Sequence, residues 1–136
     1  MNRRMANLLE QDRLFLEKSF GERWEVVLEG LTIWVLLHDF PLHNGYIQKS
    51  VTLAIRMETG YPVSQLDMMY VCPAISRADG KTIPQADQLQ MLDQKQFQRW
   101  SRHRTPSNPW VAGQDCLETH VHFIQDAFEA EFIKRP

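Results

Sequence analysis

The chain has 136 residues and a formal net charge of −2, with 43% hydrophobic and 24% charged residues. This composition is typical of a globular protein, and it excludes a disordered tail and a strongly basic nucleic-acid binder. The length predicts a single domain over residues 1–136 that is large enough to bury a core of its own.

The apolar runs of the chain are too short for a membrane helix, which needs about 18 residues or more. The longest run covers residues 31–37 and has the length of a strand. Near the N-terminus, Leu8 and Leu9 are followed at once by Glu10 and Asp12, so no signal-peptide core is present. We therefore expect a cytoplasmic protein with no membrane partner.

The first expected elements are a short helix and a group of strands. Asp12 marks the start of the helix, and Gly21 lies just beyond its end. Four β-rich runs follow, at residues 24–28, 31–38, 51–57 and 68–71. Because their connections are short, they predict an antiparallel four-stranded meander, flanked by an N-terminal helix and a C-terminal helix in an α+β fold.

The second half of the chain predicts a loop and then a helix. Residues 73–109 show little regular pattern, so we expect one long loop there. Asp115 is a good N-cap and Glu118 completes a capping box, which predicts a long final helix over residues 115–132. One face of that helix is apolar and consists of Leu117, Val121, Ile124, Phe128 and Phe132.

The most reactive stretch lies within the expected loop, at residues 99–104, and reads Arg-Trp-Ser-Arg-His-Arg. Arginine is rarely buried without a partner, so we expect this stretch to meet an anion or a group that becomes anionic during a reaction. Ser101 and His103 point to the same side if the segment is extended, and a serine nucleophile needs such a base. Arg102 and Arg104 would then stabilise an oxyanion. The ordinary alternative is that Ser101 is a simple exposed serine.

Cys116 is the runner-up nucleophile. It would be the first helical residue after Asp115, where a helix N-terminus stabilises a thiolate. Free cysteines are usually buried, however, which favours a structural role for Cys116 and still more for Cys72 beside Pro73. Two cysteines in a chain of this size do not form a disulfide framework.

Two further interpretations are weaker. Cys116 and His120 lie four residues apart, but a structural zinc site needs a second close pair of ligands, so no metal or other cofactor is expected. The basic patch is too short, on a mildly acidic chain, to predict nucleic-acid binding. Pairing of the arginines with acidic residues of the same region remains the ordinary alternative, with candidates Asp79, Asp87 and Asp93.

Three motifs occur in the order of the expected elements. They are Phe40-Pro41-Leu42-His43-Asn44-Gly45-Tyr46, Leu66-Asp67-Met68-Met69-Tyr70 and Trp100-Ser101-Arg102-His103. With the strand that ends in Cys72-Pro73, they make the chain resemble the ubiquitin-conjugating (UBC) superfamily. The details are most similar to a bacterial branch that is encoded beside ubiquitin-like proteins, activating enzymes and deconjugating proteases. The resemblance spans residues 12–132 and implies a UBC-like α+β fold.

The resemblance also shows a departure. Eukaryotic members have a catalytic cysteine shortly before a tryptophan, and a His-Pro-Asn triplet earlier in the chain. Trp110 is similar to that tryptophan, and counting back from it places Ser101 at the nucleophile position. Cys72-Pro73-Ala74 is similar to the triplet, with only the proline kept.

The resemblance implies an enzyme that accepts the C-terminal acyl group of a ubiquitin-like protein from an adenylating activating enzyme. The enzyme then passes this group to an amine of an acceptor protein. The carrier would be an oxyester on Ser101, with His103 as base and Arg102 or Arg104 assisting the charge. The competing hypothesis is a catalytically inactive UBC-like module that binds the ubiquitin-like protein or its activating enzyme.

Overall fold

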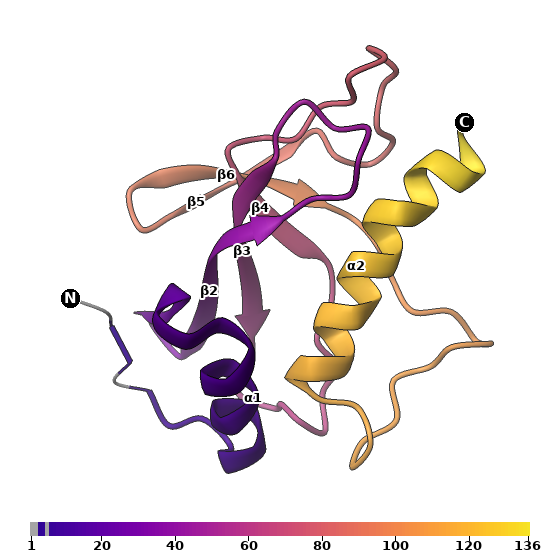
Figure 1. Cartoon of the computed structure of the whole chain (residues 1–136). Coiled ribbons are helices and arrows are strands. Elements are labelled where there is room, and N and C mark those ends of the chain that lie inside the picture. Colours follow the sequence, from indigo (N-terminus) through magenta and orange to yellow (C-terminus); the bar gives the residue numbers. More distant parts are fainter. Residues whose placement is uncertain (1–2, 5) are drawn as a thin grey trace.

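The structure is a computed structural model that describes residues 3, 4 and 6–136. The helices in this part of the chain are α1 (Glu10–Phe20), the short 3-10 helix η1 (Gly21–Arg23) and α2 (Leu117–Lys134) (Figure 1). The strands are β1 (Trp24–Glu29), β2 (Thr32–Pro41), β3 (Ser50–Met57), β4 (Met69–Cys72), β5 (Gln88–Leu92) and β6 (Lys95–Trp100). None of the helices in the described chain is long and apolar enough to cross a membrane.

The strands form one antiparallel sheet in the order β1-β2-β3-β4-β6-β5. Strands β1 to β4 make the expected meander, in which Val35 on β2 lies opposite Val26 on β1 and Ile55 on β3. The predicted α+β class is therefore confirmed, and so are the two flanking helices. The predicted number of four strands is wrong, because the sheet has six strands within the described residues.

The two additional strands, β5 and β6, lie in the region that the sequence pattern assigned to a long loop. They form a hairpin in which Leu92 pairs with Lys95. The two residues between them, Asp93 and Gln94, have left-handed backbone conformations, with φ of 53° and 62°. Two consecutive left-handed residues are typical of the type I′ turn that joins hairpin strands. The sequence hides this hairpin because its turn is Asp-Gln rather than Asn-Gly and because glutamines alternate through its strands.

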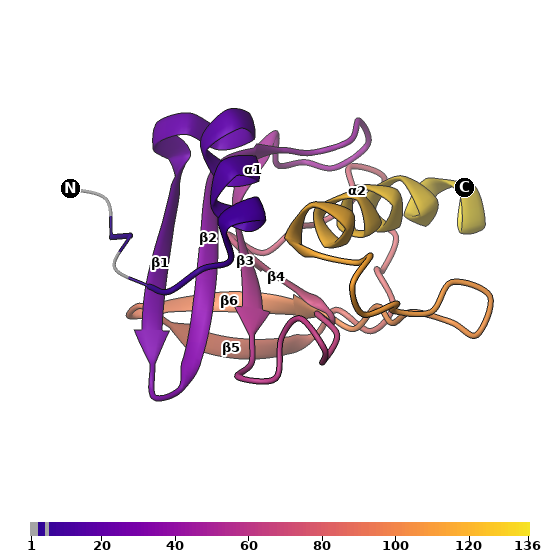
Figure 2. The ribbon, with the colours of Figure 1, turned by 90° about the horizontal axis from the view of Figure 1, so that it is seen from below.

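The sheet curls, so that the β5–β6 hairpin crosses one face of the meander while both helices cover the opposite face (Figure 2). Under the hairpin lies a second apolar cluster, made of Val27, Trp34, Leu36, Ala54, Tyr70, Leu92 and Phe97. Arg3 ties the curled ends together: its guanidinium lies 2.7 Å from each carboxylate oxygen of Asp93 and also pairs with Glu25 on β1. The hairpin is thus fixed to the first strand of the sheet.

The main core lies between the sheet and the two helices. α2 contributes Leu117, Val121, Ile124 and Phe128, and α1 contributes Leu16 and Phe20. Asp12 on α1 is also buried, and it accepts hydrogen bonds from the Tyr61 hydroxyl at 2.6 Å and the Leu117 backbone N–H at 3.3 Å. This contact joins α1 to the start of α2.

Both helices begin at other residues than predicted. α1 begins at Glu10, before Asp12. The N-cap of α2 is Cys116, and its partner in the capping box is Thr119, not Glu118. The Asp115 carboxylate turns back toward the preceding loop instead, where it accepts the Val111 backbone N–H at 2.7 Å. The predicted capping box was therefore shifted by one residue.

Candidate active site

Trp100, the last residue of β6, anchors residues 99–104 in the core. Its side chain is fully buried, and its indole N–H donates to the Gln98 side-chain oxygen at 3.0 Å. Gln98 is itself buried, and it bonds to the backbone of Ile75 and to the Ala86 carbonyl. The residues that follow Trp100 therefore emerge from a rigid strand end.

Ser101 follows directly and is half-buried. Two contacts fix its backbone: its N–H donates to the Gln85 carbonyl at 2.9 Å, and Arg102 Nη1 donates to its carbonyl oxygen at 3.0 Å. No side chain or backbone group in the described residues hydrogen-bonds to its hydroxyl. These two bonds fix the backbone from which the Ser101 hydroxyl projects.

His103 is paired with Asp67 rather than with Ser101. Its Nδ1 lies 2.9 Å and 3.2 Å from the two carboxylate oxygens of Asp67. Because a carboxylate accepts hydrogen bonds, Nδ1 is the donor in this contact. The imidazole is 54% exposed, so Nε2 is accessible from solvent. This is the arrangement of a general base whose ring is oriented by an acid.

Asp67 is a candidate site residue that the sequence pattern did not single out, although it lies in one of the three motifs. Its position follows from the pairing of β4 with β6, in which Met69 lies opposite Trp100. Continued past the strand ends, this register places residue 67 opposite residue 102, and Met68 N–H donates to the Arg102 carbonyl at 3.3 Å. The Asp67–His103 contact becomes predictable only when residues 95–100 are assigned to a strand that pairs with β4.

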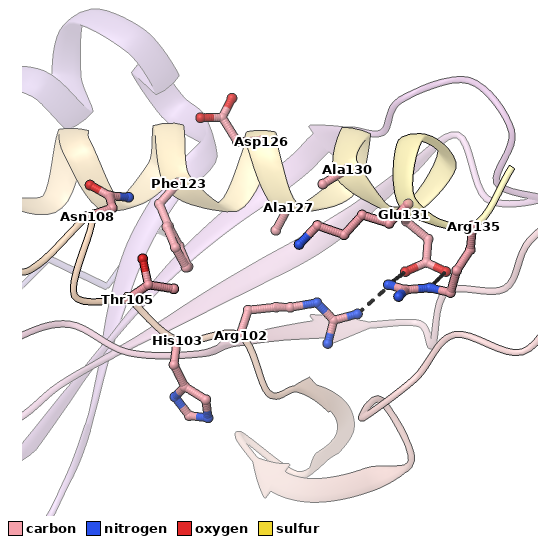
Figure 3. A pocket seen from close by; sticks show the side chains of 11 residues that line it. Arg102, His103, Thr105, Asn108, Phe123, Asp126, Ala127, Ala130, Glu131 and Arg135 are labelled. Carbon is pink, nitrogen blue, oxygen red and sulfur yellow. Dashed lines mark hydrogen bonds and ion pairs between the residues drawn. The ribbon is translucent and has the colours of Figure 1, made fainter.

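Arg102 turns to the opposite side of the segment from His103 (Figure 3). Its guanidinium stacks over the Trp100 ring at 4.9 Å, donates to the Pro84 carbonyl, and lies 3.6 Å from the buried carboxylate of Glu131 on α2. Burial lowers the pKa of Arg102, and the negative charge of Glu131 counteracts this effect. Arg102 thus holds the Ser101 backbone while facing a pocket along α2.

Arg104 has a different environment and packs between aromatic rings. Its guanidinium lies 5.3 Å from the ring centres of both Trp110 and Phe123, and 3.4 Å from the Asp115 carboxylate. Its side chain is only 8% exposed. These contacts fix the loop between β6 and α2, and they leave Arg104 little exposed surface for a substrate.

The two cysteines make their contacts with other parts of the chain than residues 99–104. The Cys116 side chain accepts a backbone N–H as the N-cap of α2, and both cysteines are free thiols. Cys72 ends β4 and contacts the apolar cluster beneath the β5–β6 hairpin. It lines a pocket of about 290 Å³ together with His38 and Phe97.

His120 does not combine with Cys116 as a metal ligand would. It is buried, and its Nε2 donates to the Met68 carbonyl at 3.0 Å. Burial lowers its pKa from 6.5 to about 4, so the ring is neutral at physiological pH. No group of three His, Cys, Asp or Glu side chains in the described chain is arranged to hold a metal ion.

Comparison with protein-family models identifies one family. Residues 8–131 match the model described as Prokaryotic E2 family E. No curated protein matches, and neither does any solved structure. The match covers nearly all of the helices and the whole sheet described above, and it includes Asp67, Ser101 and His103. The chain therefore belongs to prokaryotic E2 family E, a family of UBC-like, ubiquitin-conjugating proteins.

Proposed function

We propose that this protein carries the C-terminal acyl group of a ubiquitin-like protein as an oxyester on Ser101. The acyl group comes from an adenylating activating enzyme and passes to an amine of an acceptor protein. Family membership supports the general activity of ubiquitin-like conjugation. The site supports the particular carrier, because Ser101 lies at the position where the family resemblance places the nucleophile.

The observation that carries the proposal is the contact between His103 Nδ1 and the Asp67 carboxylate at 2.9 Å. A serine hydroxyl is a poor nucleophile at neutral pH and needs a nearby base with a free lone pair. Asp67 orients the ring so that Nε2 is that base, two residues from Ser101. Among the described residues His103 bonds to Asp67 and not to Ser101, so the proposal requires Nε2 to reach the hydroxyl when substrate binds, as catalytic hydrogen bonds often tighten only in the complex.

The reaction then proceeds in two steps, loading and transfer. In loading, Ser101 Oγ bonds to the acyl carbon, its proton moves to His103 Nε2, and the bond to the leaving group of the activating enzyme breaks, with that group taking the proton. In transfer, the acceptor amine attacks the ester carbon and gives a proton to Nε2. The ester bond breaks, and the proton returns to Ser101 Oγ. Asp67 stabilises the imidazolium formed in both steps.

Arg102 bonds directly to the proposed nucleophile residue, since it donates to the carbonyl oxygen of Ser101. We assign to it the fixing of the nucleophile and part of the charge stabilisation. Arg104, wedged between Trp110 and Phe123, serves the loop. Cys116 caps a helix and Cys72 faces the hairpin, so both thiols already have structural surroundings.

The test is to incubate the protein with the modifier, its activating enzyme and ATP, and to analyse the product by mass spectrometry. We expect an adduct on Ser101 that survives thiol reductant, which cleaves thioesters, but is released by hydroxylamine. Ser101→Ala should abolish the adduct, whereas Ser107→Ala, in the same exposed loop, should leave it intact. Cys72→Ala and Cys116→Ala should also retain it.

Two outcomes would overturn this assignment. An adduct that is lost in Cys116→Ala and retained in Ser101→Ala would make the cysteine the carrier. If the wild-type protein binds the modifier without forming any adduct, the competing hypothesis of a catalytically inactive binding module holds instead.

A further inference from the structure

A turn just before β5 lies against residues 101–102, which include the proposed nucleophile. Pro84 and Gln85 are the two central residues of this turn, and Gln85 has a left-handed backbone with φ of 54°. A proline followed by a residue of positive φ is the pattern of a type II turn, whose second central position favours glycine or asparagine. A glutamine in this conformation is therefore unusual.

Left-handed backbones at residues other than glycine occur at five positions of the described chain. Three of them belong to the turn of the β5–β6 hairpin and to the irregular stretch of β2, where strand geometry accounts for them. The other two, Met68 and Gln85, lie outside the strands, and both bond to the backbone of residues 101–102. Unusual backbone conformations of this kind occur often at functional sites.

Three successive carbonyl groups of the turn accept hydrogen bonds from residues 98–102. The Pro84 carbonyl accepts Arg102 Nη1 at 3.1 Å, and the carbonyl of the next residue accepts the Ser101 N–H at 2.9 Å. The carbonyl after that accepts Gln98 Nε2, also at 2.9 Å. Successive carbonyls of an extended strand point to alternate sides, so three in a row on one side require a break in the extended chain. The left-handed residue Gln85 supplies this break.

Both peptide groups of Ser101 are tied to the turn. The Ser101 N–H bonds directly to the Gln85 carbonyl, while the Ser101 carbonyl shares Arg102 Nη1 with the Pro84 carbonyl. The turn is itself anchored, because the residues on either side of its centre pack in the main core. A change of backbone conformation at Gln85 is therefore transmitted to Ser101.

We propose that Gln85 is a positioning residue for Ser101 and that it acts through its left-handed backbone and not through its carboxamide. The exposed Gln85 side chain makes no hydrogen bond to any residue that the structure describes, so the backbone alone makes the contact. The inference rests on the proposed function, because it concerns the placement of the hydroxyl that attacks the acyl carbon. A displacement of about 1 Å can slow a reaction by about 100-fold, so this placement affects the rate of loading.

The test changes the backbone preference of residue 85 in two directions. Gln85→Pro fixes φ at about −65° and excludes the left-handed conformation, whereas Gln85→Gly adopts that conformation freely. The Gln85 N–H donates no hydrogen bond to a described residue, so the proline does not remove one. Both variants lack the carboxamide, so a difference between them reports on the backbone. If Gln85→Pro does not fold, Gln85→Val replaces it, because a β-branched residue also disfavours positive φ.

Loading of Ser101 is measured at saturating modifier, together with the melting temperature and the affinity for the modifier. We expect Gln85→Pro to load about 10- to 100-fold more slowly with little change in affinity, because a misplaced nucleophile acts on the chemical step. Gln85→Gly should restore loading to within about two-fold of the wild-type rate. Gln94→Gly makes the same change at a left-handed residue of the hairpin turn, and this control should load at the wild-type rate.

Hydrogen exchange of the Ser101 amide, measured by NMR, separates this inference from the proposed function. The amide should exchange faster in Gln85→Pro than in the wild type or in Gln85→Gly, whether or not an adduct forms. If the wild type forms no adduct and this exchange pattern holds, the proposed function fails, but Gln85 still positions Ser101. The inference is overturned if Gln85→Pro loads and exchanges like the wild type, or if Gln85→Gly loads as slowly as Gln85→Pro.

Discussion

Two histidines, His103 and His120, are anchored to neighbouring residues of one short segment, yet their surroundings are opposite. His103 bonds to the Asp67 carboxylate and is 54% exposed. His120 bonds to the carbonyl of the next residue, Met68, and is fully buried. The first ring lies against a carboxylate at the surface, whereas the second has only a carbonyl partner in an apolar setting that disfavours an imidazolium. The surroundings, rather than the residue type, separate the proposed base from the structural histidine.

The largest expected effect is that of removing the proposed base. His103→Ala should slow adduct formation by about 100- to 10,000-fold at saturating modifier, the usual contribution of a general base. The melting temperature should stay near that of the wild type, because the side chain is mostly exposed. Single-turnover loading assays and thermal denaturation measure the two effects, and an unchanged loading rate would remove His103 from the mechanism.

Asp67→Asn tests whether the carboxylate does more than position the ring. The amide oxygen still accepts a hydrogen bond from Nδ1 but carries no charge to stabilise the imidazolium. We expect loading to slow by about 10- to 100-fold, less than in His103→Ala, because solvent also stabilises an exposed imidazolium. The modifier should bind with unchanged affinity. Asp87→Asn, in the nearby exposed loop, is the control, and equal rates in both variants would contradict the assignment.

His120 should contribute to the stability of the folded protein and not to the acyl-transfer reaction. Its folded-state pKa of about 4 lies below the ordinary value of 6.5, so the folded state binds this proton less readily than the unfolded state. Its contribution to stability is therefore complete above pH 6.5 and is lost as the pH falls toward 4. The difference amounts to about 3 kcal/mol.

His120→Phe keeps the ring packed beside Phe123 but cannot titrate or bond to Met68. It should lower the free energy of unfolding by about 1–3 kcal/mol at neutral pH and flatten its dependence between pH 6.5 and 4. Urea denaturation at several pH values measures this. A variant curve that is parallel to that of the wild type would show that His120 is not the titrating group.

The smallest effect is expected at the runner-up nucleophile. Cys116→Ser replaces one N-cap side chain by another that caps well, so the free energy of unfolding should change by less than about 1 kcal/mol. Adduct formation should keep the wild-type rate if Ser101 is the carrier. A loading defect without a loss of stability would instead give the Cys116 thiol a chemical role.

The secondary structure was predictable from the sequence in some parts of the chain and not in others. The meander was predictable because its strands are β-rich runs bounded by turn residues, and the terminal helix because its apolar residues repeat with the helical period. The β5–β6 hairpin was not, since its strands are rich in glutamine and Gln98 is buried through side-chain hydrogen bonds that no hydrophobic pattern reveals. Without β6, the sequence offers no guide to the partner of Asp67.

Within the candidate site, the sequence pointed to Ser101 and His103 but did not predict their contacts. Ser101 and His103 lie two residues apart, which predicts side chains on the same side of an extended segment, but His103 pairs with Asp67 instead. The acid that orients His103 comes from 36 residues earlier. The arginines looked equivalent in sequence, yet Arg102 faces a pocket and Arg104 lies between two aromatic rings. Such differences depend on tertiary packing, which local spacing does not encode.

The buried guanidinium of Arg77 couples local unfolding at the end of α2 to that of a neighbouring loop. It binds Asp79 in its own loop, and at the end of α2 it donates to the backbone carbonyls of Glu131 and Arg135. The last carbonyls of a helix have no further helical N–H to satisfy them. The last turn of α2 and the loop around Arg77 therefore stabilise each other and should exchange their amide hydrogens with solvent as one cooperative unit.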